Sequence, residues 1–172
     1  MTLFIERGYD EVTVADIAQR AGLTKRTFFN HFADKREVIF ASADEFQARI
    51  VGALAGTDPG LDPLTAVVLA YTRGAAMIVE YPELVRAREA LVASSQELQE
   101  RDQMKMASLT AKVAAVLVDR GVSPREALFV AQAGASTFTT AVADWAADPA
   151  IGLEHAMQEA LSDFRAAVGA AA

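Results

Sequence analysis

The stretch VTVADIAQRAGLTKRTFFNHFADKRE, residues 12–37, decides the fold of this chain. It predicts two short helices, over residues 14–21 and 25–31, that meet at Gly22, because glycine readily takes the positive φ that a tight turn between helices requires. The Lys and Arg side chains of the stretch lie mainly on the second of these helices or flank it. This layout is typical of a helix-turn-helix that places one helix in the major groove of DNA.

Charge is distributed unevenly along the chain. The whole sequence carries a formal charge of −7, but residues 1–40 hold six basic and six acidic side chains, so residues 41–172 account for the entire surplus. Residues 17–36 contain five basic side chains and a single acidic one, Asp34, so the local charge of this stretch is +4. Since charges are screened beyond about 8–10 Å at physiological salt, this local surplus matters more for a DNA partner than the acidic total.

The composition predicts an all-α protein. Of 172 residues, 52% are hydrophobic and only five are proline, and the apolar positions follow helical spacing. About nine helices are expected, with breakers at residues 56–60. Besides the two helices above, the expected helices are a truncated first helix that ends before Gly8 and a helix that begins at Pro82. The others cover residues 35–55, 63–81, 95–120, 123–147 and 151–168.

The chain lacks the residues that several function classes need. It has no cysteine and only two histidines, which excludes disulfides and thiolate nucleophiles, and we expect no metal site and no cofactor. It shows no glycine-rich phosphate loop or catalytic triad, so an enzyme is the weakest hypothesis. No apolar run reaches the roughly 20 residues that span a membrane and no leader is recognisable, so a cytoplasmic protein without membrane contact is expected.

From Thr13 to Glu37, with the lead-in Leu3-Phe4…Gly8-Tyr9, the sequence resembles the TetR family of bacterial transcriptional regulators. The resemblance covers about residues 2–45 and implies a DNA-binding domain over 1–45. It also implies a larger helical domain over 46–172 for effector binding and dimerisation. On this interpretation the protein is a ligand-responsive homodimeric repressor that binds a palindromic operator.

The predicted DNA contacts lie at the start of the helix over residues 25–31. Arg26 is expected to read guanine through its planar fork, and Lys25 to contact guanine or phosphate. Thr27 shares that end, and Asn30 either pairs with adenine or is a solvated polar residue. The resemblance assigns phosphate contacts to the following residues: Thr13, Thr24, Phe29, His31 and Lys35.

Two of these positions carry a second interpretation. Phe29 stands where many relatives carry Tyr, and without the hydroxyl it either touches a thymine methyl or sugar, or simply packs. His31 is equally well explained as a boundary residue between core and solvent.

A largely apolar effector is expected in the second domain, because aromatic and methionine side chains form adaptable pocket walls. The candidate ligand-binding residues are Tyr71, Met77, Arg88, Met104, Phe129, Phe138 and Trp145. The eighth and ninth helices, with small residues over 131–136 and an apolar stripe over 153–168, are expected to form the homodimer interface. Packing of both helices within one subunit is the alternative. For the whole chain, the competing hypothesis is a helical ligand carrier or protein-interaction module that does not bind DNA.

Overall fold

The computed structural model describes residues 1–169, and these residues are helical with short connections, as the composition predicted. The α-helices are α1 (Thr2–Arg7), α2 (Val14–Arg20), α3 (Lys25–His31), α4 (Arg36–Ile39), α5 (Ala43–Ala55), α6 (Pro63–Gly74), α7 (Pro82–Ala93), α8 (Gln96–Asp119), α9 (Pro124–Ala147) and α10 (Leu153–Gly169). Two 3-10 segments, η1 (Ala75–Ile78) and η2 (Pro149–Ile151), follow α6 and α9.

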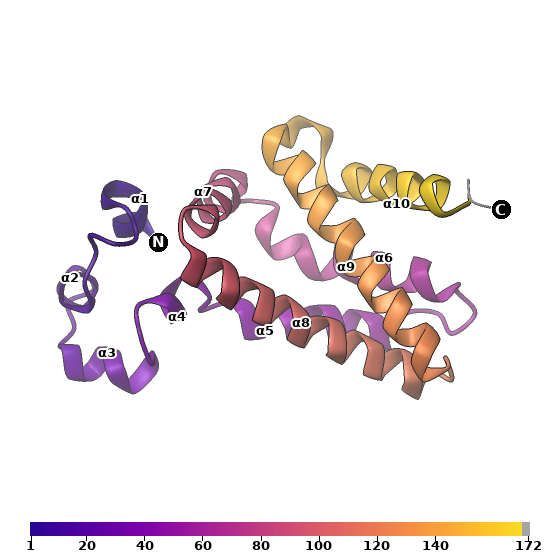
Figure 1. Ribbon diagram of the computed structural model, residues 1–172, viewed down its shortest axis with the longest axis horizontal. Coiled ribbons are helices and arrows are strands. Elements are labelled where there is room, and N and C mark those ends of the chain that lie inside the picture. Colours follow the sequence, from indigo (N-terminus) through magenta and orange to yellow (C-terminus); the bar gives the residue numbers. More distant parts are fainter. Residues whose placement is uncertain (170–172) are drawn as a thin grey trace.

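The molecule is elongated, with two parts of unequal size (Figure 1). We call α1–α3 the head; it lies at one end, and α4 leads from it into the body formed by α5–α10. The two longest helices, α8 and α9, run through the body, and the C-terminal end of α10 lies far from the head. The elements that carry the helix-turn-helix signal are therefore presented away from most of the acidic chain.

The body is built around one apolar core in which α6 and α9 approach closely. At Gly134 of α9, a Cβ atom would lie 2.3 Å from Cγ1 of Val67 on α6, so no larger residue fits there. Trp145 and Tyr71 are the largest fully buried side chains of this core. The small residues that the sequence suggested for a dimer interface thus serve, in part, packing within the chain.

A second apolar core joins the head to the body. Side chains of α1 and of the loop after it pack with α4 and with the facing ends of α7 and α8. The buried members are Leu3, Phe4, Tyr9, Val12, Ile39, Phe40, Leu91, Val92 and Leu98. The head is therefore seated on the body by apolar contacts, not merely tethered to it.

The continuous helix predicted over residues 35–55 is wrong. It is split into α4 and α5 by a turn at residues 40–42, where Phe40 has φ −103° and ψ 14°. Ile39 and Phe40 belong to the second core, whereas Ile50 and Leu54 belong to the body core. A single straight helix could not place the first pair of residues in one core and the second pair in the other, so the chain bends between the two pairs.

The helix predicted over residues 63–81 also ends early, at Gly74, and continues as the 3-10 turn η1. Tyr81 precedes Pro82, which disfavours helical backbone at the residue before it, and Tyr81 has φ −130° and ψ 51°.

Among the described residues, no helix is both long enough and apolar enough to cross a membrane.

Candidate DNA-binding surface and ligand cavity

The start of α2 is held by a capping box, as the sequence predicted. The Thr13 hydroxyl accepts from the backbone N–H of Asp16 at 3.2 Å, and the Asp16 carboxylate accepts from the backbone N–H of Thr13 at 2.9 Å. The Thr13 hydroxyl and the Thr13 backbone N–H both donate to the Asp16 carboxylate, and they hold the pKa of Asp16 below its ordinary value because they favour the charged form. The first turn of α2 is thus fixed by local chemistry.

The turn into α3 is equally well specified. Gly22 has φ 69°, a value that L side chains rarely adopt, which confirms the predicted turn. Thr24 then caps α3, its hydroxyl accepting from the backbone N–H of Thr27 at 3.1 Å. Phe28 is buried, and its ring centroid lies 5.3 Å from that of Phe32. The orientation of α3 against α2 therefore rests on a cap, a glycine and a pair of aromatic rings.

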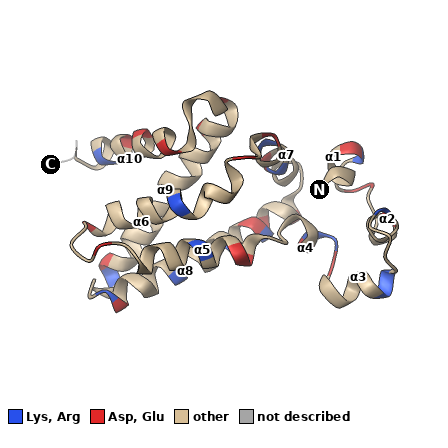
Figure 2. Ribbon diagram, turned by 180° about the vertical axis from the view of Figure 1, so that it is seen from behind, with Lys and Arg blue, Asp and Glu red and all other residues tan. Residues whose placement is uncertain are grey.

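The first residues of α3 are exposed cations (Figure 2). Within residues 1–169, Lys25 and Arg26 form no salt bridge, whereas Arg20 pairs with Glu6 at 3.4 Å and Arg36 pairs with Glu97 at 2.9 Å. The local charge of +4 is therefore not all available to a partner. Its unneutralised part is concentrated at the N-terminal end of α3, where an anion also meets free backbone N–H groups.

Lys35 occupies a different position from the one a free phosphate contact would need. Its Nζ donates to the backbone carbonyl oxygens of Tyr9 at 2.8 Å and Val12 at 3.1 Å, and lies 3.5 Å from that of Asp10. The same ammonium sits 4.1 Å from the ring centroid of Tyr9. In this structure Lys35 ties the loop between α1 and α2 to the start of α4.

The remaining predicted DNA contacts lie on or beside α3. Phe29, Asn30 and His31 are exposed, and the Phe29 ring meets Phe28 edge-on at 5.4 Å. Thr27 is half-buried, and its hydroxyl is 2.9 Å from that of Thr24. The structure thus brings Lys25, Arg26 and the exposed part of α3 onto one surface.

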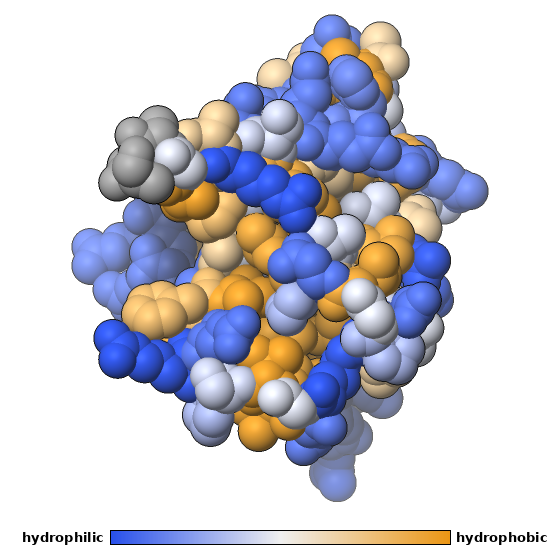
Figure 3. Space-filling model, turned by 90° about the vertical axis from the view of Figure 1, so that its right-hand side faces the viewer, coloured by the Kyte–Doolittle hydropathy of each residue, from blue (hydrophilic) through white to orange (hydrophobic). Residues whose placement is uncertain are grey.

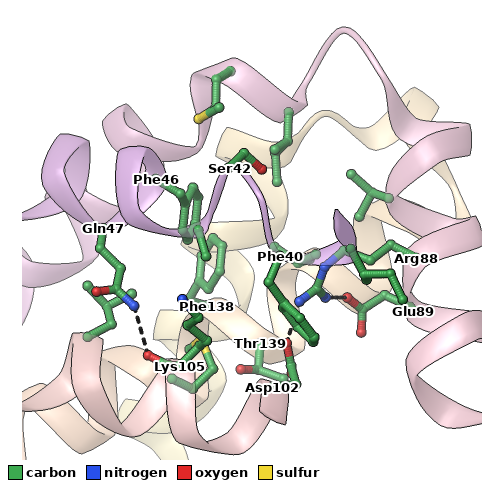
Figure 4. A pocket seen from close by; sticks show the side chains of 18 of the residues that line it. Phe40, Ser42, Phe46, Gln47, Arg88, Glu89, Asp102, Lys105, Phe138 and Thr139 are labelled. Atoms are coloured by element: carbon green, nitrogen blue, oxygen red, sulfur yellow. Dashed lines mark hydrogen bonds and ion pairs between the residues drawn. The ribbon is translucent and has the colours of Figure 1, made fainter. Parts of the chain in front are cut away.

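A cavity of about 230 Å³ lies where the body meets α4 (Figure 4). Its walls come from α4, α5, η1, α7, α8 and α9. The apolar lining includes Ile39, Phe40, Phe46, Met106, Leu109 and Val142. Because Ile39 and Phe40 also belong to the second core, the cavity shares a wall with the packing that seats the head.

The predicted ligand-binding residues do not come together in one place. Met77, Arg88 and Phe138 line the cavity. Tyr71 lies behind this wall, its ring stacked on Phe138 at 4.8 Å, and its hydroxyl has no hydrogen-bond partner among the described residues. The other three are elsewhere: Met104 and Phe129 are exposed on the outside, and Trp145 is buried in the body core.

Sequence reasoning missed most of the cavity lining and the polar contacts that α8 makes with Tyr9 and with α4. The Tyr9 hydroxyl donates to Glu97 at 3.0 Å, and Arg101 donates to Glu37 at 2.7 Å. These partners are 88 and 64 positions apart in the chain. Since the spacing of a helix repeats within a few residues, no local pattern could have identified such pairs.

Residues 1–41 match the model of a family described as bacterial regulatory proteins, tetR family. The chain is also similar to two curated proteins. It is 36% identical over 67 residues to the HTH-type transcriptional regulator TcmR of Streptomyces glaucescens, covering 39% of this chain and 30% of that protein. It is 33% identical over 72 residues to the transcriptional regulator MftR of Mycobacterium tuberculosis, covering 40% of this chain and 36% of that protein. The matched region thus spans about a third of each curated relative.

The whole fold has a counterpart among solved structures. A transcriptional regulator from Rhodococcus sp. Rha1 superposes with a TM-score of 0.55 at 21% identity, over 96% of this chain and 91% of that one. At this identity the likeness concerns the fold, and it covers the body as well as the head. The N-terminal region, with the capped α2–α3 pair and its exposed cations, is thus similar to the DNA-binding domain of the tetR family of bacterial regulatory proteins.

Proposed function

We propose that this protein is a cytoplasmic DNA-binding transcriptional regulator that binds a palindromic operator as a homodimer and represses until a small ligand binds its body. The observation that carries the DNA-binding part is the start of α3, where Lys25 and Arg26 are exposed and unpaired within the described chain. A helix that enters the major groove places its N-terminal residues nearest the base edges. Arg26 is assigned base readout, and Lys25 either readout or a phosphate contact.

The DNA-binding proposal is tested by selecting duplexes from a random pool with the full chain. A two-fold symmetric consensus is expected, because two copies of one head read two half-sites. Arg26→Ala should then weaken binding by about 1–3 kcal/mol and relax one base position. Recovery of no consensus, or equal binding of selected and scrambled duplexes at physiological salt, would favour the ligand carrier or interaction module instead.

Lys25→Ala separates the two roles left open for that residue. A phosphate contact predicts weaker binding of all sequences alike, with a salt slope smaller by about one. A base contact predicts relaxed preference at one position. Either result supports the surface, whereas wild-type binding by both single variants contradicts it.

Ligand response is supported by the position of the cavity. Ile39 of α4 and Phe40, which follows it, line the cavity and also pack in the core that seats the head. A molecule that fills the cavity therefore meets the element on which the angle of the head depends. A ligand that fits one orientation of α4 better than another would shift the spacing of the two heads and hence operator affinity.

The dimer is proposed to form through the outer faces of α9 and α10. Leu128 and Phe129, on successive positions of α9, are 47% and 60% exposed, and Val168 on α10 is exposed too. Apolar surface bordered by hydrophilic side chains is visible at the end of the molecule opposite the head (Figure 3). Exposed apolar residues of this kind are the usual core of a homodimer interface.

Phe129→Glu should convert the dimer to a monomer, because it places a charge in the proposed interface. Sedimentation velocity of the full chain measures this directly. Met104→Glu is the matched control, since Met104 is 63% exposed but lies on α8. A dimer that survives Phe129→Glu unchanged contradicts the assigned surface.

A further inference from the structure

Every charged side chain that lines the cavity already has an opposite partner. Arg88 pairs with Glu89 at 2.7 Å and with Asp102 across the gap between α7 and α8. Lys105 lies 3.4 Å from Asp44 and 3.9 Å from Glu37. The four charged lining residues, Arg88, Glu89, Asp102 and Lys105, sum to zero. The cavity therefore offers neither an unpaired cation nor an unpaired carboxylate among the described residues.

The remaining wall is apolar and partly aromatic. The Phe46 and Phe138 ring centroids are 5.7 Å apart, and Tyr71 backs Phe138 from the core side. Arg88 also lies 5.2 Å from the ring centroid of Phe40. Figure 4 shows Phe46 and Phe138 side by side, with the Arg88, Glu89 and Asp102 group at another part of the wall. Flat apolar surfaces of this kind suit stacked or edge-on aromatic partners.

The volume of the cavity indicates the size of the group that fills it. An engineered cavity of about 150 Å³ takes one benzene ring, and this cavity measures about 230 Å³. By this comparison, an aromatic group of about two fused rings fills the cavity.

We infer that the cavity takes an uncharged, flat aromatic molecule of about two fused rings. This inference rests on the proposed ligand response and names the class of ligand. An anion would have to displace Asp102 or Glu89 from Arg88, or Asp44 and Glu37 from Lys105, and a cation would have to displace Arg88 from its two carboxylates. An ion that gains no partner loses its hydration without compensation, whereas a neutral ring loses little.

Isothermal titration calorimetry of the full chain tests this with three probes on one ring system: naphthamide, naphthoate and naphthylmethylammonium. Naphthamide is expected to bind at least about tenfold more tightly than either ion. Equal or tighter binding of either ion overturns the inferred class but leaves ligand response standing. If none of the three binds, it is the ligand response assigned to this cavity that fails.

The site of binding is checked with two variants of α9. Ala143 lines the cavity yet is exposed, so Ala143→Phe is expected to fold and to block naphthamide. Ala147 is also exposed and lies one turn further along α9 outside the lining, so Ala147→Phe is the matched control. Loss of naphthamide binding in both variants, or in neither, places the probe elsewhere and overturns the inference.

The role of the paired charges is tested by releasing Arg88. Asp102→Asn keeps the shape of the side chain but removes its charge, so naphthoate should gain at least about tenfold while naphthamide changes by less than about threefold. Glu89→Gln removes the other carboxylate that pairs with Arg88. It provides the same comparison of naphthoate with naphthamide if Asp102→Asn does not fold. Unchanged preference in a folded variant contradicts the proposed basis of selectivity.

Discussion

At the scale of single residues, two lysines of similar sequence context do different things. Lys25 is exposed at the start of α3 and forms no salt bridge in the described chain, whereas the Lys35 ammonium donates to the carbonyl oxygens of Tyr9 and Val12. Both are charged residues near the same motif, so charge counting treats them alike. The structure separates a residue free for a partner from one used to hold the head together.

Lys35→Met should lower the free energy of unfolding by about 1–2 kcal/mol, because carbonyl groups lose charge-assisted hydrogen bonds while the aliphatic stem is kept. Lys25→Met is the matched control and should leave stability unchanged. Chemical denaturation of both variants, followed by circular dichroism, gives the comparison. Equal stability of the two variants would show that the Lys35 contacts contribute nothing.

At the scale of elements, the starts of α2 and α6 depend on carboxylates. Asp16 accepts from the backbone N–H of Thr13, the N-cap residue of α2, at 2.9 Å, and Asp62 caps α6 by accepting from the backbone N–H of Thr65 at 2.9 Å. Hydrogen bonds from Thr13 and Thr65 hold the pKa values of Asp16 and Asp62, respectively, below their ordinary values. A carboxyl whose pKa is lowered by folding contributes stability above its unfolded pKa, and this contribution is lost as pH falls through the folded pKa.

The free energy of unfolding should therefore fall as pH is lowered from about 5 to below the ordinary carboxyl pKa of about 4. Asp62→Asn keeps a capping side chain but does not titrate, so its stability should fall less steeply over this range. Asp163→Asn, at an exposed position of α10, should follow the wild type. Thermal melts at a series of pH values measure the slopes, and identical slopes in all three proteins would contradict the assignment.

At the scale of the whole molecule, α8 links the head to the body. Glu97 accepts from the Tyr9 hydroxyl at 3.0 Å and pairs with Arg36 at 2.9 Å, while Arg101 donates to Glu37 at 2.7 Å. Burial and the hydrogen bond to Glu97 raise the pKa of Tyr9. Tyr9 also belongs to the second core, so both apolar packing and these polar contacts hold the head on the body.

Glu97→Ala should loosen the head by about 1 kcal/mol without unfolding the body, because it removes an acceptor shared by Tyr9 and by Arg36 of α4. Hydrogen exchange should become faster in α1 and α4 and stay unchanged in α9. Glu100→Ala is the matched control, since Glu100 accepts only from Gln96 of the same helix in the described structure. If hydrogen exchange in α1 and α4 is equally fast in both variants, Glu97 does not help to hold the head on the body.

The local chemistry of the chain could be predicted from its sequence. The caps at Thr13 and Thr24, the turn at Gly22 and the long helices over 95–120 and 123–147 agree with the structure to within a residue or two. Each depends on interactions between residues at most four positions apart, and such spacing is visible in the sequence itself.

Only the tertiary structure decided where the helix over 35–55 breaks, which residues line the cavity and what Lys35 contacts. The chain bends after Ile39 because Phe40 packs in the second core whereas Ile50 packs in the body core, and Phe138 reaches the cavity while Trp145, on the same helix, does not. These outcomes depend on partners many positions away, whose positions are set by the packing of all the helices together. The sequence by itself therefore determined a capped α2–α3 pair with a basic start to α3, and the packing determined the neutral aromatic cavity and the seat of the head.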